Sequence, residues 1–231
     1  MTREDIYLKL KKYIKRYFIG TQHEWESHID NILRIFDENL KIYIPNNILD
    51  VGCGSGDRTI RIANHFNIDM RNTYGVDYDD QLVTACKKRF NAGRIDLETA
   101  DLPYEDNTFD LVICNQVLEH LKNYGKVIDD LIRVTKKGGY IAVGIPNLAH
   151  LINRMYLLFG IQPMCIHLDG SHVRSFTHKS FVEMLASVRG VKLIDCKGAL
   201  MYPLPFIVAT FLANYFIGLS GYTCYLLRKT Q

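Results

Sequence analysis

Through the middle of the chain, short apolar runs alternate with segments whose apolar residues recur at three- and four-residue spacing. A short apolar run predicts a buried strand, and the wider spacing predicts a helix with one buried face. Strands that alternate with helices predict an α/β fold with a doubly wound, mostly parallel sheet whose ligands bind at the carboxyl ends of the strands. The predicted strands span residues 48–51, 72–77, 94–99, 109–114 and 140–145, and the predicted helices span residues 57–66, 79–90 and 124–134.

Two amphipathic helices are predicted before this sheet, over residues 4–18 and 25–40, and a Pro-Asn-Asn break follows them. We therefore divide the chain into an N-terminal helical cap, residues 1–44, and one ligand-binding domain, residues 45–231. Of the 231 residues, 48% are apolar and 23% are charged, which is typical of a globular domain with a full core. The net charge of +3 is too small to indicate nucleic acid as a partner.

A glycine-rich loop joins the first predicted strand to the helix after it. Gly52, Gly54 and Gly56 stand at alternate positions, where they allow a tight turn and a close approach of backbone to ligand. The next helix offers free N–H groups and the positive end of its dipole. The third glycine of the dinucleotide-binding fingerprint would fall at Asp57. A carboxylate there would repel a pyrophosphate but would tolerate a sulfonium or ammonium group, which disfavours an NAD-dependent oxidoreductase.

Two carboxylates complete this pattern. Asp77 ends the second predicted strand, 21 positions after Gly56, where a carboxylate in a βαβ unit accepts hydrogen bonds from ribose hydroxyls. Asp101 follows the polar strand predicted at 94–99 and is placed to accept a hydrogen bond from an adenine amino group. The three signals together predict a site for a nucleoside that carries a positive charge.

Taken in order, these motifs resemble the class I S-adenosylmethionine-dependent methyltransferases, in particular their small-molecule branch. Phe109-Asp110-Leu111-Val112, Leu118-Glu119-His120-Leu121 and Lys136-Lys137-Gly138-Gly139 extend the match, which covers roughly residues 45–200. The resemblance implies a Rossmann-like sheet of seven strands, with residues 222–227 as the antiparallel seventh, and S-adenosylmethionine as cofactor with S-adenosylhomocysteine as product. The cofactor-binding residues that it implies are Asp50, Gly52, Cys53, Gly54, Gly56, Asp77, Tyr78, Asp101, Leu102 and Asn115.

Methyl transfer needs a general base only when the acceptor binds in its protonated form. The candidates are His120, which follows the strand expected beside the sulfonium, and His167 and His172, which lie in residues 146–176, where the resembled family varies its acceptor pocket. His167, His172 and His178, together with Asp169, could instead hold a metal ion. We prefer a connecting loop whose histidines line a pocket, and expect no metal.

Two segments bear on the acceptor. Residues 199–221 contain no charged side chain, and they form, with 146–176, the predicted acceptor-side insertions. The apolar part is shorter than a membrane span needs, so a packed helix, an interfacial segment and a pocket wall all remain open. The helix predicted at 4–18 has a basic polar face, which can lie on an anionic membrane. Residues 1–18 and 203–219 are therefore candidates for peripheral membrane contact.

We expect a methyltransferase that acts at oxygen or carbon of a small-molecule or lipid-like acceptor. The six cysteines are isolated along the chain and no signal peptide is apparent, which indicates a cytoplasmic protein. The segment Cys114-Asn115-Gln116-Val117 stands where amino-directed relatives carry Asn/Asp-Pro-Pro-Tyr, so nitrogen is a disfavoured target. The alternatives are a protein acceptor and a cofactor-binding partner protein without turnover. The oligomeric state is not predicted.

Overall fold

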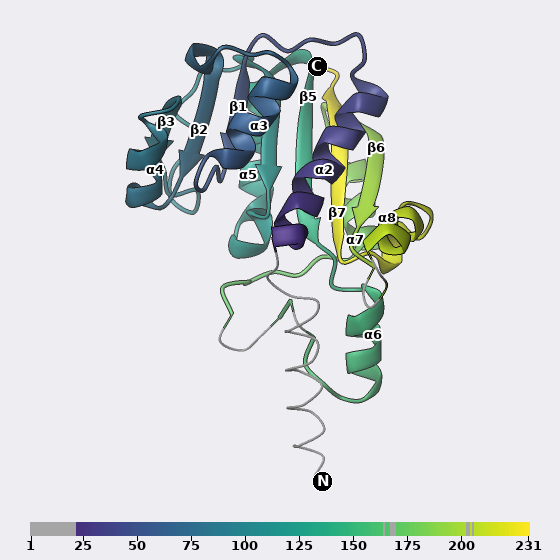
Figure 1. Ribbon diagram of the computed structural model, residues 1–231. Helices are drawn as coiled ribbons and strands as arrows, with labels where there is room; N and C mark the ends of the chain where they lie inside the picture. Colours follow the sequence, from purple (N-terminus) through teal and green to yellow (C-terminus); the bar gives the residue numbers. More distant parts are fainter. Residues whose placement is uncertain (1–21, 164, 167–169, 202–203, 205) are drawn as a thin grey trace.

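A seven-stranded sheet forms the centre of the computed structural model, which describes residues 22–163, 165–166, 170–201, 204 and 206–231 (Figure 1). The strand order is β3-β2-β1-β4-β5-β7-β6. Strands β1 to β5 pair in parallel, and β7 is antiparallel to both of its neighbours, which confirms the predicted sheet and its last strand. The bounds are β1 Ile48–Val51, β2 Thr73–Asp77, β3 Asn91–Arg94, β4 Phe109–Asn115, β5 Thr135–Pro146, β6 Val191–Ala199 and β7 Tyr222–Lys229.

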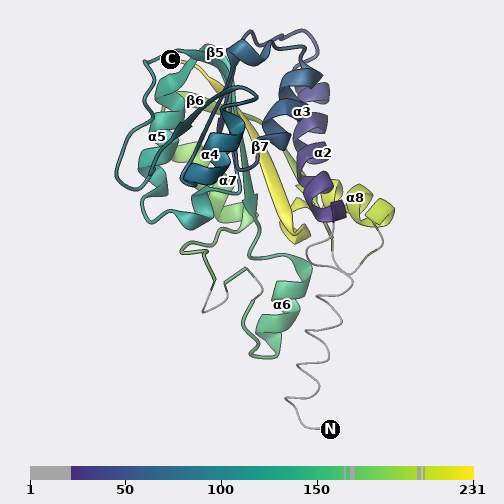
Figure 2. The same ribbon diagram turned by 60° about the vertical axis from the view of Figure 1, so that its left-hand side comes forward.

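Helices cover both faces of the sheet. Helices α2 and α3 lie on one face, and α5 and α7 lie on the other (Figures 1 and 2). The α-helices are α2 Gln22–Asn39, α3 Asp57–His65, α4 Asp80–Cys86, α5 Tyr124–Val134, α6 Leu151–Leu158, α7 His178–Ser187 and α8 Phe206–Tyr215. The described residues also include the short 3-10 helices η1 Met70–Asn72, η2 Leu118–His120 and η3 Ile217–Leu219. The helix predicted at 4–18 falls outside the described residues.

Side chains of β1 alternate between the two layers of the core, as the pleat requires. Ile48 packs with the α2–α3 layer, whereas Leu49 and Val51 pack with the α5–α7 layer. On the first side, Ile32 and Phe36 of α2 are almost completely buried. Residues 22–39, which the sequence assigned to a cap, thus form part of the layer that covers the sheet.

The prediction of a strand over residues 94–99 is wrong. Strand β3 ends at Arg94, and the chain then turns, with the Thr99 N–H donating to the Asp96 carbonyl at 3.1 Å. The Asp96 carboxylate accepts the Glu98 N–H at 3.0 Å, the kind of local bond by which aspartate competes with strand pairing. Asp101 therefore does not stand at the end of a strand.

Helix α6 and strand β6 were not predicted from the sequence. Helix α6 follows β5 and projects from the edge of the sheet at which the parallel strands end (Figure 1). Strand β6 lies at the edge of the sheet and pairs only with β7, so its side chains are half-buried and give no continuous apolar run. Strand β6 belongs to the half of the sheet beyond β4, and α6 follows β5 in that same half, away from the glycine-rich loop.

Candidate functional site

A pocket of about 500 Å³ opens at the carboxyl ends of β1, β2, β3 and β4. The sheet order reverses between β1 and β4, so their carboxyl ends diverge to opposite sides and leave the crevice in which open α/β sheets bind ligands. Every stretch of the lining therefore follows one of these strands. The lining residues are Gly52, Asp77, Tyr78, Ile95, Asp96, Leu97, Glu98, Gln116, Val117, His120 and Leu121.

The glycine-rich loop reaches this pocket at Gly52. Gly52 has φ +78° and Gly56 has φ +78°, a left-handed conformation that favours glycine. A Cβ on Gly56 would lie 2.6 Å from the Phe90 ring, so the loop also needs glycine there for space. Gly54 has φ +54° and nothing within 4 Å of the place where its Cβ would stand. A ligand can therefore approach the backbone at Gly54.

Asp77 connects β2 to this loop. Its carboxylate accepts the Gly54 N–H at 2.8 Å and the Asp79 N–H at 3.0 Å. Since a carboxylate can accept about four hydrogen bonds, about two positions remain for a ligand's hydroxyl groups. Tyr78 follows with 64% of its side chain exposed, and the Arg94 guanidinium lies 5.3 Å from its ring centroid. The ring is free to pack against a flat ligand group.

Asp96, and not Asp101, faces the pocket. The turn after β3 places Asp96 and Leu97 in the lining, whereas Asp101 is exposed and pairs with Lys126 at 2.9 Å. That ion pair lowers the pKa of the Asp101 carboxyl. The Leu102 backbone is occupied elsewhere, because Asp130 accepts its N–H. The sequence analysis singled out Asp101 and not Asp96, and the turn at residues 96–99 brings Asp96 into the lining.

Three other predicted residues lie beneath the pocket and do not line it. Asp50 is fully buried and accepts the Thr59 hydroxyl proton at 2.6 Å, and burial raises the pKa of its carboxyl. Asn115 is buried too, with its Oδ1 accepting from the Tyr222 hydroxyl at 2.6 Å. Cys53 packs in an apolar cluster below the loop, and burial raises the pKa of its thiol. These side chains support the loop from below.

Residues 49–143 match the model of a methyltransferase domain family. Norajmaline N-methyltransferase of Rauvolfia serpentina is 31% identical over 138 residues, which cover 54% of this chain and 44% of that protein. Demethylmenaquinone methyltransferase of Bacillus mycoides is 34% identical over 99 residues, which cover 40% of this chain and 41% of that protein. The chain thus spans less than half of the length of either relative.

The fold comparison agrees. The crystal structure of an S-adenosylmethionine-dependent methyltransferase from Thermotoga maritima superposes with a TM-score of 0.62 at 15% identity, over 98% of both chains. Residues 49–143 thus match a methyltransferase domain, and the fold around them is that of the class I S-adenosylmethionine-dependent methyltransferases. The cofactor of this family is S-adenosylmethionine, whose adenosine matches a pocket with an open glycine loop and a strand-end carboxylate.

A pair of histidines lies where the pocket meets the segment after β5. His120 lines the pocket, and its ring centroid lies 4.8 Å from that of His172 at an interplanar angle of 70°. The two rings come from segments far apart in the sequence. His167, the third predicted base, falls outside the described residues.

Glu119, next to His120, is completely buried. Burial raises the pKa of its carboxyl to about 8. Burial also lowers the pKa of His172. The sequence motif singled out Glu119-His120, but no sequence signal joined it to His172.

A second cavity of about 250 Å³ adjoins the first through Gln116 and is lined by His28, Ile29, Arg58 and Gln116. Arg58 donates to the Gly52 carbonyl at 2.9 Å and so holds the glycine-rich loop from the side of α3. His28, on α2, stacks on Tyr222 with ring centroids 4.3 Å apart. His28 and Ile29 lie on α2, which carried no motif, and the sequence analysis did not assign Arg58 or Gln116 to the binding site.

Proposed function

We propose that this chain transfers the methyl group of S-adenosylmethionine to oxygen or carbon of a small-molecule or lipid-like acceptor. The observation that carries the proposal is the single pocket that joins Gly52 and Asp77 at one side to His120 at the other. Donor and acceptor can therefore lie in one continuous space. Holding them in line supplies most of the catalysis when the leaving group is already a sulfonium.

For the cofactor, we assign the ribose hydroxyls to the two remaining acceptor positions on Asp77, and the adenine to Asp96, Leu97 and the Tyr78 ring. Asp96 thereby replaces Asp101 as the acceptor for the adenine amino group. Asp96→Asn should weaken the binding of S-adenosylhomocysteine by about tenfold, because the substitution removes one charged hydrogen-bond acceptor. Equal affinity of this variant and the wild-type protein, measured by calorimetry, would refute the assignment.

The transfer step follows from the cofactor's chemistry. The acceptor atom attacks the methyl carbon, the carbon–sulfur bond breaks, and its electron pair stays on sulfur, which leaves neutral S-adenosylhomocysteine. A hydroxyl acceptor must also lose its proton. We assign the activation of that hydroxyl to the pair of His120 and His172, the predicted bases that the structure brings together.

The acceptor is proposed to be a small organic molecule with an apolar part. The pocket wall near His120 includes Val117 and Leu121, and the relatives are named for norajmaline and demethylmenaquinone. One of these names specifies nitrogen as the methylated atom. The Cys114-Asn115-Gln116-Val117 segment of this chain, with Asn115 buried against Tyr222, favours oxygen or carbon here.

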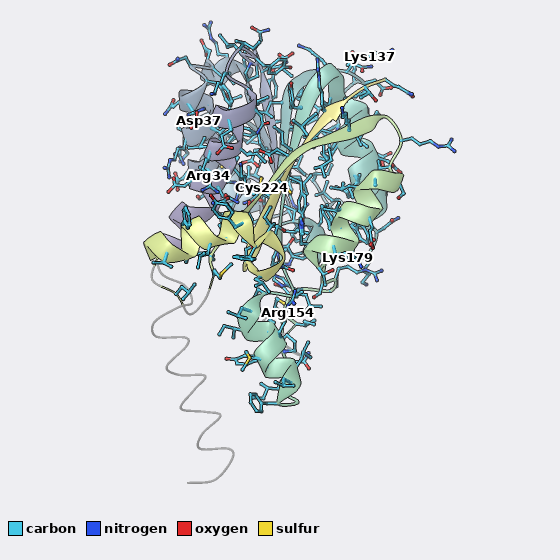
Figure 3. All side chains as sticks on the ribbon, turned by 90° about the vertical axis from the view of Figure 1, so that its right-hand side faces the viewer. Arg34, Asp37, Lys137, Arg154, Lys179 and Cys224 are labelled. Atoms are coloured by element: carbon cyan, nitrogen blue, oxygen red, sulfur yellow. The ribbon has the colours of Figure 1, made fainter. Side chains whose placement is uncertain are left out.

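We further propose peripheral contact with a membrane from a cytoplasmic location. Helix α6 and the stretch after it expose large apolar side chains, as does α8, and Figure 3 shows α6 projecting beyond the body of the protein. In the part of the chain that the structure describes, no helix combines the length and the apolar character that crossing a bilayer requires. The exposed side chains are Met155, Leu157, Leu158, Phe159, Val208, Phe211, Tyr215 and Phe216.

The first experiment is calorimetric titration of the full chain with S-adenosylhomocysteine, with NADH as control. Micromolar binding of S-adenosylhomocysteine alone supports the proposal, and binding of NADH alone would refute it. Methyl transfer from labelled S-adenosylmethionine to a panel of phenols, quinones and lipid extracts then tests turnover. Cofactor binding without transfer to any of them would favour the partner protein without turnover.

A further inference from the structure

Three side chains with metal-ligating atoms meet beside the pocket. The ligand atoms of Glu119, His120 and His172 all lie within 4.8 Å of one another, and no other such group of three occurs among the described residues. A cation bonded at about 2.1 Å to nitrogen and oxygen ligands requires its ligand atoms to be roughly 3–4 Å apart. Small side-chain rotations would therefore bring the three groups around one ion.

The hydrogen bonds of the two histidines leave Nε2 free on each ring. His120 Nδ1 lies 3.1 Å from the Ser171 carbonyl, and His172 Nδ1 lies 2.9 Å from the Cys165 carbonyl. A carbonyl oxygen can only accept, so each Nδ1 carries the proton and each neutral ring has its lone pair on Nε2. Metal-binding histidines are oriented in this way, with the other ring nitrogen donating to a backbone carbonyl.

Glu119 supplies a second, independent indication of a ligand. Its side chain is 0% exposed, and neither carboxylate oxygen has a hydrogen-bond partner on another residue that the structure describes. No cation of the described residues forms an ion pair with it. A buried carboxyl group without a partner is favoured in its protonated, neutral form, and a bound cation would stabilise the ionised form.

The backbone holds the cluster together. The Glu119 carbonyl accepts the N–H groups of Val173 at 2.9 Å and Arg174 at 3.0 Å. These two bonds fix the segment after β5 across η2 and place His172 opposite His120. Ligands from two distant parts of the chain are thereby brought together without the metal.

We propose that Glu119, His120 and His172 bind one divalent cation of the Zn²⁺, Mn²⁺ or Fe²⁺ class. Two imidazoles and one carboxylate suit these ions and leave coordination positions open. Because His120 lines the pocket, an open position can face the acceptor. The role of this cation rests on the proposed methyl transfer. It also specifies the acceptor, which would carry a hydroxyl oxygen able to bind a metal.

The cation would activate that oxygen in place of a free histidine base. A bound cation lowers the pKa of a coordinated hydroxyl group, so the hydroxyl releases its proton to solvent water at neutral pH. The resulting oxyanion attacks the methyl carbon, and the electron pair of the broken carbon–sulfur bond stays on sulfur. The cation is neither oxidised nor reduced.

The test is a Mn²⁺ titration of the full chain after removal of metal with EDTA and dialysis, with S-adenosylhomocysteine present. Free Mn²⁺ is followed by electron paramagnetic resonance. We choose Mn²⁺ because it binds thiolates weakly, so the six cysteines should not take it up. We expect one ion per chain, and at least tenfold weaker binding by Glu119→Gln and by His172→Gln. His65→Gln is the matched control, since His65 also lies 3.1 Å from a carboxylate, that of Asp37, but outside the pocket.

Absence of stoichiometric Mn²⁺ binding, or unchanged affinity in both variants, would overturn the inference. Calorimetry with S-adenosylhomocysteine on the same wild-type sample separates the two proposals, because cofactor binding without Mn²⁺ binding refutes the metal site alone. If Glu119→Gln does not fold, as judged by circular dichroism, His172→Gln decides, since its side chain is only half-buried.

Discussion

Replacement of Asp77 by asparagine tests the cofactor site most directly. The Asp77 carboxylate accepts two backbone N–H groups, from Gly54 and Asp79, and has about two further positions for the ribose. Asparagine keeps the shape but has one acceptor oxygen, and its amide nitrogen would face a backbone N–H or a ribose hydroxyl. At least one charge-assisted bond is lost in the complex, worth about 1.5–3 kcal/mol.

This loss corresponds to a Kd for S-adenosylhomocysteine that is roughly ten- to 150-fold higher. Isothermal titration calorimetry measures it, and urea denaturation checks that the variant is folded. Asp101→Asn is the matched control, because Asp101 is exposed and pairs with Lys126, and the Kd of this variant should stay within about twofold of wild type. Unchanged binding by Asp77→Asn, or tenfold weaker binding by Asp101→Asn, would refute the proposed placement of the cofactor.

Gly56→Ala should lower the free energy of unfolding, measured in urea, by about 2–4 kcal/mol, because alanine is strained in the left-handed conformation and its Cβ would also clash with Phe90. Gly54→Ala has the backbone strain without a clash and should lower it by only about 1 kcal/mol. Burial lowers the pKa of His28 from 6.5 to about 4, so protonation opposes folding and stability falls as the pH drops through this interval. Between these pH values, the free energy of unfolding of His28→Gln should fall by up to about 3 kcal/mol less than that of the wild-type protein. Parallel curves of this free energy against pH for the two proteins would contradict the prediction. Phe159→Ser should weaken binding to anionic vesicles, measured by co-sedimentation, by about tenfold. Equal co-sedimentation of the variant and the wild-type protein would exclude the surface around α6 as a membrane contact.

Much of the cofactor half of the protein was predictable because its signals are local. A left-handed turn needs glycine at the residue itself, so Gly52 and Gly56 mark the loop without reference to distant residues. Asp77 is marked locally too, since it ends strand β2. This strand pairs with β1, the strand that leads into the glycine-rich loop. The antiparallel last strand was predicted by resemblance at residues 222–227, and its pairing with β5 confirms it as β7, residues 222–229.

Other features depend on contacts that no local pattern encodes. Asp50 and Asn115 lie at strand ends like Asp77, yet packing from Thr59 and Tyr222 buries them below the pocket. The helix at 22–39 was recognisable from its periodicity, but its place in the sheet layer follows from the surface that it buries.

By itself, the sequence determined the alternation of strands and helices, the glycine-rich loop and its family, because each depends on neighbouring residues and their spacing. Only the tertiary structure decided that Asp96 enters the pocket in place of Asp101, since an aspartate-centred turn ends β3 early. Only the tertiary structure brought His172 to Glu119 and His120, through two backbone hydrogen bonds between segments distant along the chain. Such long-range pairings depend on how the layers pack, and packing is a property of the whole fold.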